Sequence, residues 1–348
     1  MSEPNNIWPL VSVIMPIRNE ADFIERALIS ILNSNYPKDL LEVLVVDGMS
    51  TDGTRQIVEN FSAKDRRVRL IDNIRKTVPY ALNIGLLEMK GTLFVRIDGH
   101  VEIPPDFIRN SVICLNDKKD AWLVGGYIET IAEGFIGKAI SAAMQSPIGV
   151  GNAMFRRGDY EGWVDTLAFG MHHRWIIEKI GYFDEQLVRN QDDDFNFRVI
   201  KAGGKIWLSK SIRSTYFSRS SLRKLWQQYF QYGFWRIRTI QKHGRPATMR
   251  QLAPLILVLS LLGLGMLCIL FPLFIYLLMI EIVIYLLGLV YGAFDIGRKT
   301  SFKYSILAPL IFAILHFGYG LGCLWGIIRF VLLGGRGLPK PEDHKLSR

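Results

Sequence analysis

The sequence predicts an α/β domain followed by membrane-spanning helices toward the C-terminal end. Two patterns in the 348 residues indicate this arrangement. In the first part of the chain, short apolar strands alternate with amphipathic helices, the order that produces a doubly wound, mainly parallel sheet. Further on, long apolar runs contain almost no charged residues, and each run is long enough to cross a bilayer.

Strands alternating with helices account for the first hundred residues. The strands are expected at residues 11–15, 42–46, 68–71 and 93–97, and the helices at residues 21–33, from about residue 54, and at residues 78–89. Each strand ends in polar residues. Because parallel strands bring their carboxyl ends to one edge of a sheet, and ligands bind at that edge, these polar residues are expected to line a site.

The fourth strand ends in Asp98-Gly99-His100. The glycine permits a tight turn, so a carboxylate and an imidazole stand side by side at the end of the strand. Both side chains can face one divalent cation, and Mg²⁺ or Mn²⁺ is the natural partner when phosphate oxygens complete the coordination. A solvated turn is the alternative interpretation of this tripeptide.

Polar residues also follow the first two strands. Asn19 and Glu20 come after the first strand, and Asp47 and Asp52 come after the second. Together with Asp98 they predict a cleft that can hydrogen-bond a base and a ribose and hold a metal. The predicted cleft has too few positively charged side chains to neutralise a diphosphate. A bridging metal would supply the missing positive charge. Ordinary turns and helix caps are the alternative for each acidic residue taken singly.

A second acidic segment lies at residues 190–196. It contains the consecutive carboxylates Asp192, Asp193 and Asp194 before a predicted helix that ends at Gly203-Gly204. Adjacent carboxylates repel one another unless a metal, a substrate or an arginine compensates. A solvated helix start, favoured by the helix dipole, is the alternative interpretation.

The C-terminal part of the chain is predicted to be a membrane domain. Glu281 is the only charged residue between Arg250 and Asp295. Pro272 divides this stretch into two runs, which predicts a helical hairpin, and residues 304–328 form a further apolar run. The sequence leaves open whether two or three helices span the bilayer, and what Glu281 does.

Charge and composition bear on the partners of the chain. The net charge of +10 could suggest nucleic acid. The basic residues between positions 213 and 250, however, lie beside the apolar runs, which is typical of a cytoplasmic juxtamembrane belt, so no nucleic-acid partner is expected. The N-terminus lacks a signal-peptide pattern, so the first part of the chain is expected to stay in the cytoplasm. The three cysteines lack the spacing of metal ligands.

These patterns divide the chain into four parts. Residues 1–218 are expected to form the α/β domain, and residues 219–250 an amphipathic helical region at the membrane interface. Residues 251–335 are expected to form the membrane domain, and residues 336–348 a polar, basic tail.

Several motifs in this order resemble the family 2 glycosyltransferases of GT-A fold, whose sheet is Rossmann-like. The matching segments are PIRNE, VVDGMSTDGT, RIDGH, VDTLAFG, GYFDE and NQDDDFNFR, and the likeness covers roughly residues 10–245. The RIDGH form is most similar to the bacterial exopolysaccharide branch that includes succinoglycan-biosynthesis glucosyltransferases. Two positions depart from the family pattern: Gly48 stands where a second aspartate is common, and His100 replaces the second carboxylate of the metal motif, which favours Mn²⁺.

The resemblance implies a role for each candidate residue. Asp98 and His100 would hold the metal, and Asp192 would be the general base, with Asp194 and Arg198 orienting its helix. Gln231 and Trp235 match the family's closing motif only in part. The nucleotide would be bound by Pro16, Asn19, Glu20, Asp47, Asp52, Asn83 and Asp98.

The function implied is inverting transfer of glucose or another hexose from a nucleotide donor, most simply a UDP-sugar, to a lipid-linked oligosaccharide at the bilayer. One alternative is a polyprenyl-phosphate sugar synthase, in which a lipid phosphate attacks directly and needs no general base. An alternative of another class is a non-catalytic, nucleotide-binding membrane scaffold. In each case a multi-pass protein of the cytoplasmic membrane is expected, with the α/β domain facing the cytoplasm.

Overall fold

The computed structural model describes residues 8–151, 153–156, 158–218 and 220–334, and the predicted tail at 336–348 lies outside them. The chain forms two compact units. The first contains the chain up to Glu129, Gly158–Glu185 and Gln191–Phe217; the second contains Thr130–Arg157, Gln186–Asn190 and the chain from Ser218 onward. This division differs from the predicted boundary at residue 218, because two internal segments group with the second, helical unit.

The first unit begins with the predicted alternation of strands and helices. Its elements are β1 (Val11–Ile17), α1 (Ile24–Leu32), the 3₁₀ turn η1 (Lys38–Leu40), β2 (Leu41–Asp47), α2 (Thr54–Lys64), β3 (Val68–Asp72), α3 (Val78–Glu88) and β4 (Leu93–Arg96). The strands β3, β2, β1 and β4 pair in that order and in parallel. Every residue of β1 and β2 is buried, as expected of parallel strands covered on both faces.

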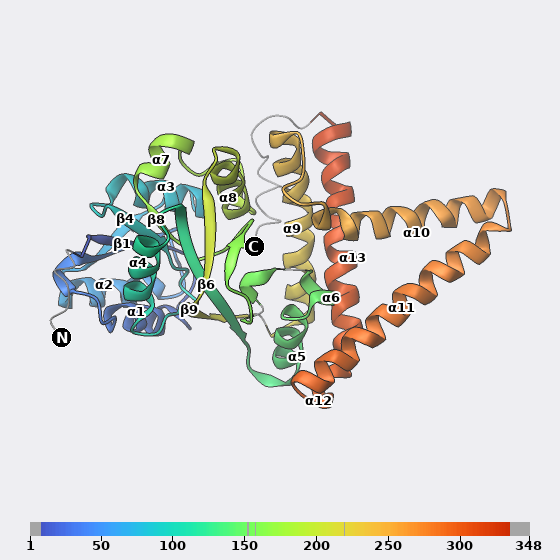
Figure 1. The fold of residues 1–348 in the computed structure, drawn as a ribbon, viewed down its shortest axis with the longest axis horizontal. Helices are drawn as coiled ribbons and strands as arrows, with labels where there is room; N and C mark the ends of the chain where they lie inside the picture. Colours follow the sequence, from blue (N-terminus) through green and yellow to red (C-terminus); the bar gives the residue numbers. More distant parts are fainter. Residues whose placement is uncertain (1–7, 152, 157, 219, 335–348) are drawn as a thin grey trace. The chain divides into compact units, whose positions relative to one another are not determined.

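The rest of this sheet is mixed rather than parallel (Figure 1). Its further elements are β5 (Val101–Glu102), α4 (Phe107–Asp117), β6 (Ala121–Ile131), β7 (Gly162–Val164), β8 (Met171–His173), α7 (Trp175–Ile180), α8 (Gln191–Lys201) and β9 (Lys205–Phe217). In the described part of the chain the strand order is β3-β2-β1-β4-β8-β6-β9-β5, with β7 beside β9. β8 runs antiparallel to β4 and β6, so the parallel arrangement is confined to the first four strands.

The register of the parallel strands aligns their carboxyl ends. Ile17 of β1 pairs with Asp47 of β2, and Asp47 in turn pairs with Asp72 of β3. β4 pairs with the other side of β1 and ends at Arg96. The polar segments that follow β1, β2 and β4 therefore leave the sheet at one edge, as the sequence predicts.

The second unit is helical. It contains α5 (Gly134–Met144), α6 (Pro147–Val150), α9 (Leu222–His243), α10 (Ala253–Leu270), α11 (Phe274–Lys299), α12 (Phe302–Ser305) and α13 (Ala308–Gly326), with the short turns η2 (Met154–Arg156), η3 (Met249–Leu252) and η4 (Ile327–Leu332). Among the described residues, three helical stretches are long and apolar enough to cross a membrane: Met249–Leu270, Phe274–Lys299 and Ala308–Leu332. The break at Pro272 separates the first two, as predicted.

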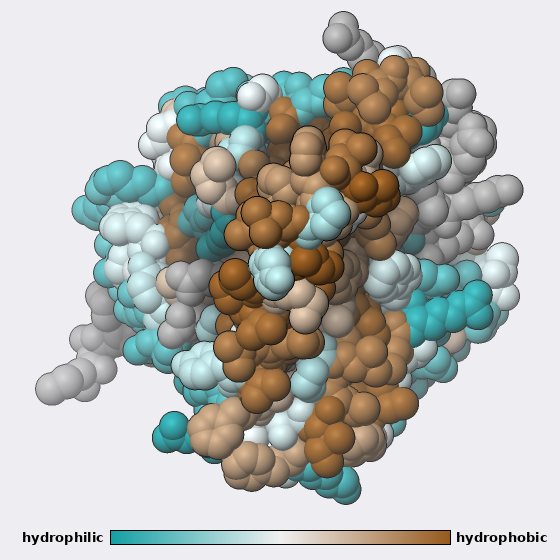
Figure 2. Space-filling model, turned by 90° about the vertical axis from the view of Figure 1, so that its right-hand side faces the viewer, coloured by the Kyte–Doolittle hydropathy of each residue, from teal (hydrophilic) through white to brown (hydrophobic). Residues whose placement is uncertain are grey.

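The hairpin formed by α10 and α11 exposes apolar side chains along most of its length. Figure 2 shows hydrophobic residues covering the face that the hairpin presents to the viewer. Ile269 near its tip is 82% exposed and Leu273 is 76% exposed. Such a surface is unfavourable in water and favourable in lipid, which supports the assignment of these helices as membrane spans.

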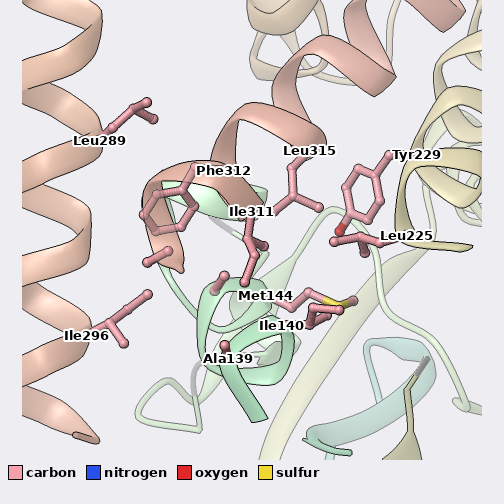
Figure 3. Packing of buried hydrophobic residues seen from close by; sticks show 12 residues of the cluster. Ala139, Ile140, Met144, Leu225, Tyr229, Leu289, Ile296, Ile311, Phe312 and Leu315 are labelled. Carbon is pink, nitrogen blue, oxygen red and sulfur yellow. The ribbon is translucent and has the colours of Figure 1, made fainter. Parts of the chain in front are cut away.

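The internal segment at residues 130–157 belongs to the helical unit because α5 packs into its core. Ile140 and Met144 of α5 are buried with Leu225 of α9 and with Ile311 and Phe312 of α13 (Figure 3). The sequence analysis assigned this segment to the α/β domain. An 11-residue apolar helix is too short to span a bilayer, so the sequence gives no sign that it packs among spanning helices.

Glu281, whose role the sequence leaves open, has a partner inside the hairpin. Its Oε1 accepts a hydrogen bond from the hydroxyl of Ser260, so α11 contacts α10 through a polar pair. Polar pairs between spanning helices stabilise their association, because each group would otherwise be unsatisfied in lipid.

Candidate active site

The segments after β1 and β2 are joined by hydrogen bonds between side chains and backbone. The Asn19 N–H donates to Ser50 Oγ at 2.9 Å, and the Thr51 N–H donates to Asn19 Oδ1 at 2.9 Å. The Ala21 N–H donates to Asp52 Oδ2 at 3.1 Å. Asn19 and Asp52 therefore lie together at the predicted edge, where they fix the two loops against each other.

Asp47 ends β2 and is fully buried. Its Oδ1 accepts a hydrogen bond from Ser50 Oγ at 2.5 Å, and its Oδ2 lies 3.6 Å from Nη1 of Arg55. Both oxygens thus face protein groups. Asp47 shapes the loop at the predicted nucleotide edge, and its contact with a nucleotide stays a prediction.

Asp52 keeps its negative charge readily. Burial alone would raise the pKa of its carboxyl, but hydrogen bonds from Thr54 and from the Ala21 backbone outweigh burial and lower the pKa below its usual value. The Thr54 N–H and hydroxyl donate to Oδ1 at 3.1 and 2.5 Å. Asp52 therefore holds the first residue of α2, whose N-cap position is Gly53.

Backbone strain concentrates at the same edge. Asn19, Met49 and Lys76 have φ angles of +54°, +58° and +65°, and they follow β1, β2 and β3 respectively. Left-handed φ angles are costly for residues other than glycine and persist where the surrounding structure holds them. Three of the five such residues in the described part of the chain thus lie at the edge where the sequence predicts a site.

At the end of β4, the guanidinium of Arg96 binds Asp98, the predicted metal ligand. Arg96 Nε lies 2.7 Å from Asp98 Oδ1, and Arg96 Nη2 lies 2.9 Å from Oδ2. Both side chains are largely buried, at 17% and 14% exposure. This is the bidentate geometry in which a guanidinium binds a carboxylate most strongly. Arg96 is a residue that the sequence analysis did not single out, and its position two residues before Asp98 on the strand is the signal that could have found it.

His100, the second predicted ligand, contacts Glu20. His100 Nδ1 lies 2.9 Å from Glu20 Oε1. Burial alone would lower the pKa of His100, but its hydrogen bond with Glu20 and the charge of Glu20 raise the pKa above its usual value. Glu20 was expected to face the nucleotide; in the structure it orients the imidazole.

Asp98 and His100 supply donor atoms suited to a divalent cation. Carboxylate and imidazole donors fit Mn²⁺, and a carboxylate that holds the other nitrogen of a histidine is the usual second partner of a metal-binding imidazole. Within the described residues, no three His, Cys, Asp or Glu side chains form a complete metal site. A cation held by Asp98 and His100 would need further ligands from elsewhere, and the metal stays a prediction.

At the start of α8, Asp194 is fully buried and paired with Arg198. Arg198 Nε donates to Asp194 Oδ2 at 2.9 Å, and its Nη1 and Nη2 donate to the carbonyl oxygens of Ile180 and Tyr182 at 2.5 and 3.0 Å. Arg198 thereby fastens α8 to the segment after α7. These contacts hold the helix in place, the supporting role that the resemblance implies for both residues.

Asp193 faces the segment before β8. Its Oδ1 accepts a hydrogen bond from Thr166 Oγ1 at 3.2 Å, and Thr166 Oγ1 accepts one from Asn196 Nδ2 at 3.0 Å. The motif VDTLAFG thus meets the acidic motif through Thr166. Of the three consecutive carboxylates, Asp193 and Asp194 are both engaged in fixing α8.

Asp192 has the environment of a general base. Burial raises the pKa of its carboxyl, the adjacent charge of Asp193 raises it further, and the nearby guanidinium of Arg96 partly offsets both effects. Arg96 is the same residue that binds Asp98. Arg96 is therefore close enough to act on the charge of Asp192 while it binds Asp98, although the two carboxylates are far apart in the sequence.

An aromatic stack holds β4 and α8 together. The ring of Phe94 on β4 stacks on His172 of β8 with centroids 4.7 Å apart, and His172 meets Phe195 of α8 edge to face at 5.5 Å. Burial lowers the pKa of His172 to about 4, so this imidazole is neutral and acts as a packing residue. Together these rings fix the distance between the end of β4 and the start of α8.

Two residues expected to bind the nucleotide are engaged elsewhere. Pro16 is buried within β1, where it pairs with Val46. Asn83 Nδ2 donates to Glu185 Oε1 at 3.0 Å, and Asn83 Oδ1 accepts from the Phe183 N–H at 2.9 Å. Asn83 thus clamps the GYFDE segment to α3, and these contacts give no support to its predicted nucleotide role.

Comparisons with known proteins agree with this geometry. The model of the glycosyl transferase family 2 matches residues 12–181. The succinoglycan biosynthesis protein ExoA of Rhizobium meliloti is 30% identical over 250 residues, which cover 70% of this chain and 74% of ExoA. A dolichyl N-acetyl-α-D-glucosaminyl phosphate 3-β-D-2,3-diacetamido-2,3-dideoxy-β-D-glucuronosyltransferase of Methanococcus voltae is 26% identical over 329 residues, covering 92% of this chain and 97% of the relative.

Solved structures share the fold at lower identity. The Staphylococcus aureus TarS fragment 1–349, solved in complex with UDP-GlcNAc, superposes with a TM-score of 0.51 and 14% identity, covering 90% of each chain. The chain thus shares the fold of this TarS fragment. The chain belongs to the family 2 glycosyltransferases, in the branch that includes ExoA. It is therefore a sugar-transferring enzyme.

Proposed function

We propose that this enzyme transfers a hexose, with inversion, from a UDP-sugar to a hydroxyl of a lipid-linked oligosaccharide at the membrane. The observation that carries the proposal is the position of Arg96, which binds Asp98 at the carboxyl edge of the sheet and lies close enough to Asp192 for its charge to act on that carboxyl. Asp98 would bind the metal that faces the donor diphosphate, and Asp192 would take the proton from the acceptor hydroxyl.

The donor side is supported by the polar edge of the sheet. Asn19, Asp47 and Asp52 hold amide and carboxylate groups at this edge, beside the start of α2, where they can accept hydrogen bonds from a base and a ribose. The TarS complex with UDP-GlcNAc, which shares the fold, favours a uridine nucleotide.

Asp98 and His100 would hold Mn²⁺ or Mg²⁺ against the donor. When bound, such a cation neutralises the charge that develops on the departing diphosphate. The chain's own part is to present one carboxylate and one imidazole at the end of β4. Glu20 orients the imidazole by its hydrogen bond to Nδ1, which leaves Nε2 for the cation.

Asp192 would remove the proton from the acceptor hydroxyl as its oxygen attacks the anomeric carbon. A carboxylate in water is a weak base, and a raised pKa makes it a better proton acceptor near neutral pH. Burial and the charge of Asp193 raise the pKa of Asp192. Asp194 and Arg198 keep its helix in place.

A lipid-linked acceptor is supported by the apolar helices and by the relatives. Three helical stretches among the described residues are suited to a bilayer. The name of the Methanococcus voltae relative describes transfer to a sugar carried on dolichyl phosphate, and that of ExoA describes succinoglycan biosynthesis. We therefore assign the enzyme to the cytoplasmic membrane, with multiple spans and with the catalytic unit on the cytoplasmic side.

The proposal is tested by measuring release of UDP or GDP from a panel of nucleotide sugars, with Mn²⁺ or Mg²⁺ and a membrane lipid extract as acceptor. Asp192→Asn and Asp98→Asn should each lower turnover by about 10²- to 10⁴-fold, while Asp39→Asn at an exposed ion pair should not. Turnover that survives Asp192→Asn with a polyprenyl phosphate would indicate the synthase alternative. Nucleotide binding without turnover of any donor would indicate a scaffold.

A further inference from the structure

Asp98, the predicted metal ligand, is already neutralised by the protein itself. Both of its oxygens accept hydrogen bonds from Arg96, at 2.7 and 2.9 Å, in a bidentate pair that is largely shielded from water. Charge-assisted bidentate pairs are among the strongest side-chain interactions. A divalent cation that binds this carboxylate must therefore compete with a guanidinium.

Arg96 is also held toward α8. On a strand, residues two apart point to the same face, so Arg96 shares a face with Phe94. On a helix, residues three apart lie on the same side, so Asp192 shares a side with Phe195. Phe94 and Phe195 are joined through His172 by ring contacts of 4.7 and 5.5 Å. This packing places Arg96 on the face of β4 that is turned toward α8.

We propose that Arg96 is the resting counter-ion of the metal site: it holds Asp98 when no divalent cation is bound and releases the carboxylate when one enters with the nucleotide. Arg96 is thus a positioning residue that acts through Asp98. Release leaves the guanidinium near Asp192, where a positive charge favours the ionised base. This inference rests on the proposed function, because it takes Asp98 as a metal ligand.

The test measures Mn²⁺ affinity by titration calorimetry on the full chain in detergent, without nucleotide. Arg96→Met removes the competing charge and keeps a long apolar stem, so it should bind Mn²⁺ about tenfold more tightly than the wild type. The matched control is Arg66→Met, since Arg66 forms an exposed pair with Asp39 on the same unit and should leave Mn²⁺ affinity unchanged. Equal or weaker affinity in Arg96→Met overturns the inference.

A second variant covers the case in which Arg96→Met does not fold, as judged by thermal melting. Lysine keeps the charge but lacks the planar fork, so Arg96→Lys should hold Asp98 less firmly and bind Mn²⁺ about threefold more tightly. Unchanged affinity in a folded Arg96→Lys contradicts the proposal.

A repeat with UDP separates the two proposals. If the wild type takes up Mn²⁺ with UDP and neither Arg96 variant shows a gain, the counter-ion role is wrong and the proposed metal site stands. If no variant binds Mn²⁺ with or without UDP, both the counter-ion role and the metal site are wrong.

Discussion

The charged side chains at this site form ion pairs, and each pair has a different role. Arg96 with Asp98 and Glu20 with His100 occupy the predicted metal side, and Arg198 with Asp194 fixes the helix of the base. Burial and the like charge of Asp193 raise the pKa of Asp192. A carboxylate tuned in this way is suited to proton transfer, which makes its titration a direct test of its role.

The pH profile of the reaction should follow Asp192. Activity needs its ionised form, so kcat/KM should fall as pH drops through the raised pKa, above the range of an ordinary carboxyl. Asp193→Asn removes a charge that raises this pKa, so the acid limb of the profile should move to lower pH. Asp39→Asn, at an exposed pair, should leave the limb in place. If the acid limb of the Asp193→Asn profile stays at the wild-type pH, Asp192 is not the group whose titration produces it.

The stability of the folded protein should depend on the ion pair between Arg198 and Asp194, on the helix that carries Asp192. Arg198→Met removes the guanidinium that pairs with the fully buried Asp194, and breaking such a buried pair costs about 3–5 kcal/mol. The loss should appear as a large decrease in the melting temperature of the purified protein. Arg66→Met, which breaks an exposed pair, should melt like the wild type. Similar melting of both variants would show that the buried pair is not a stabilising contact.

At the scale of elements, α9 and α13 approach so closely at two glycines that no side chain fits at those positions. A Cβ added to Gly233 of α9 would collide with the carbonyl oxygen of Tyr319, and one added to Gly322 of α13 would collide with that of Phe230. Glycines at such positions let two helix backbones approach, as in packed membrane helices. The amphipathic helix predicted for the interface is therefore fastened to the third candidate span rather than lying alone.

This packing predicts a contrast between two glycines. Gly233→Leu should force α9 and α13 apart, lower the melting temperature and reduce recovery of folded protein in detergent. Gly263→Leu on α10 should have little effect, because nothing lies within 4 Å of the added Cβ. Both variants add the same side chain to a helix interior. Equal behaviour would mean that backbone contact between α9 and α13 is unimportant.

At the scale of the whole molecule, the chain combines a soluble type of catalytic unit with helices that need lipid. We predict that the full chain stays with the membrane after a carbonate wash, because its candidate spans expose apolar surface. Protease should cleave the catalytic unit in inside-out vesicles and spare it in right-side-out ones. Cleavage in right-side-out vesicles alone would place the unit on the opposite side from the one proposed.

Periodicity and turn residues were sufficient to predict the first half of the fold. Buried runs such as residues 11–15 and 42–46 form β1 and β2, and the break at Pro272 separates two apolar helices, because these features depend on local patterns. The placement of α5 could not be predicted, because its core contacts with Leu225 and Ile311 come from residues distant in sequence.

The sequence alone determined the family, the polar edge of the sheet and the apolar C-terminal helices, because motif order and hydrophobic period are properties of neighbouring residues. Only the tertiary structure decided which charges meet. Arg96 faces both Asp98 and Asp192, Glu20 turns to His100, and Asn83 clamps Phe183. Such pairings depend on how β4, β8 and α8 pack, and packing joins residues that no local pattern connects.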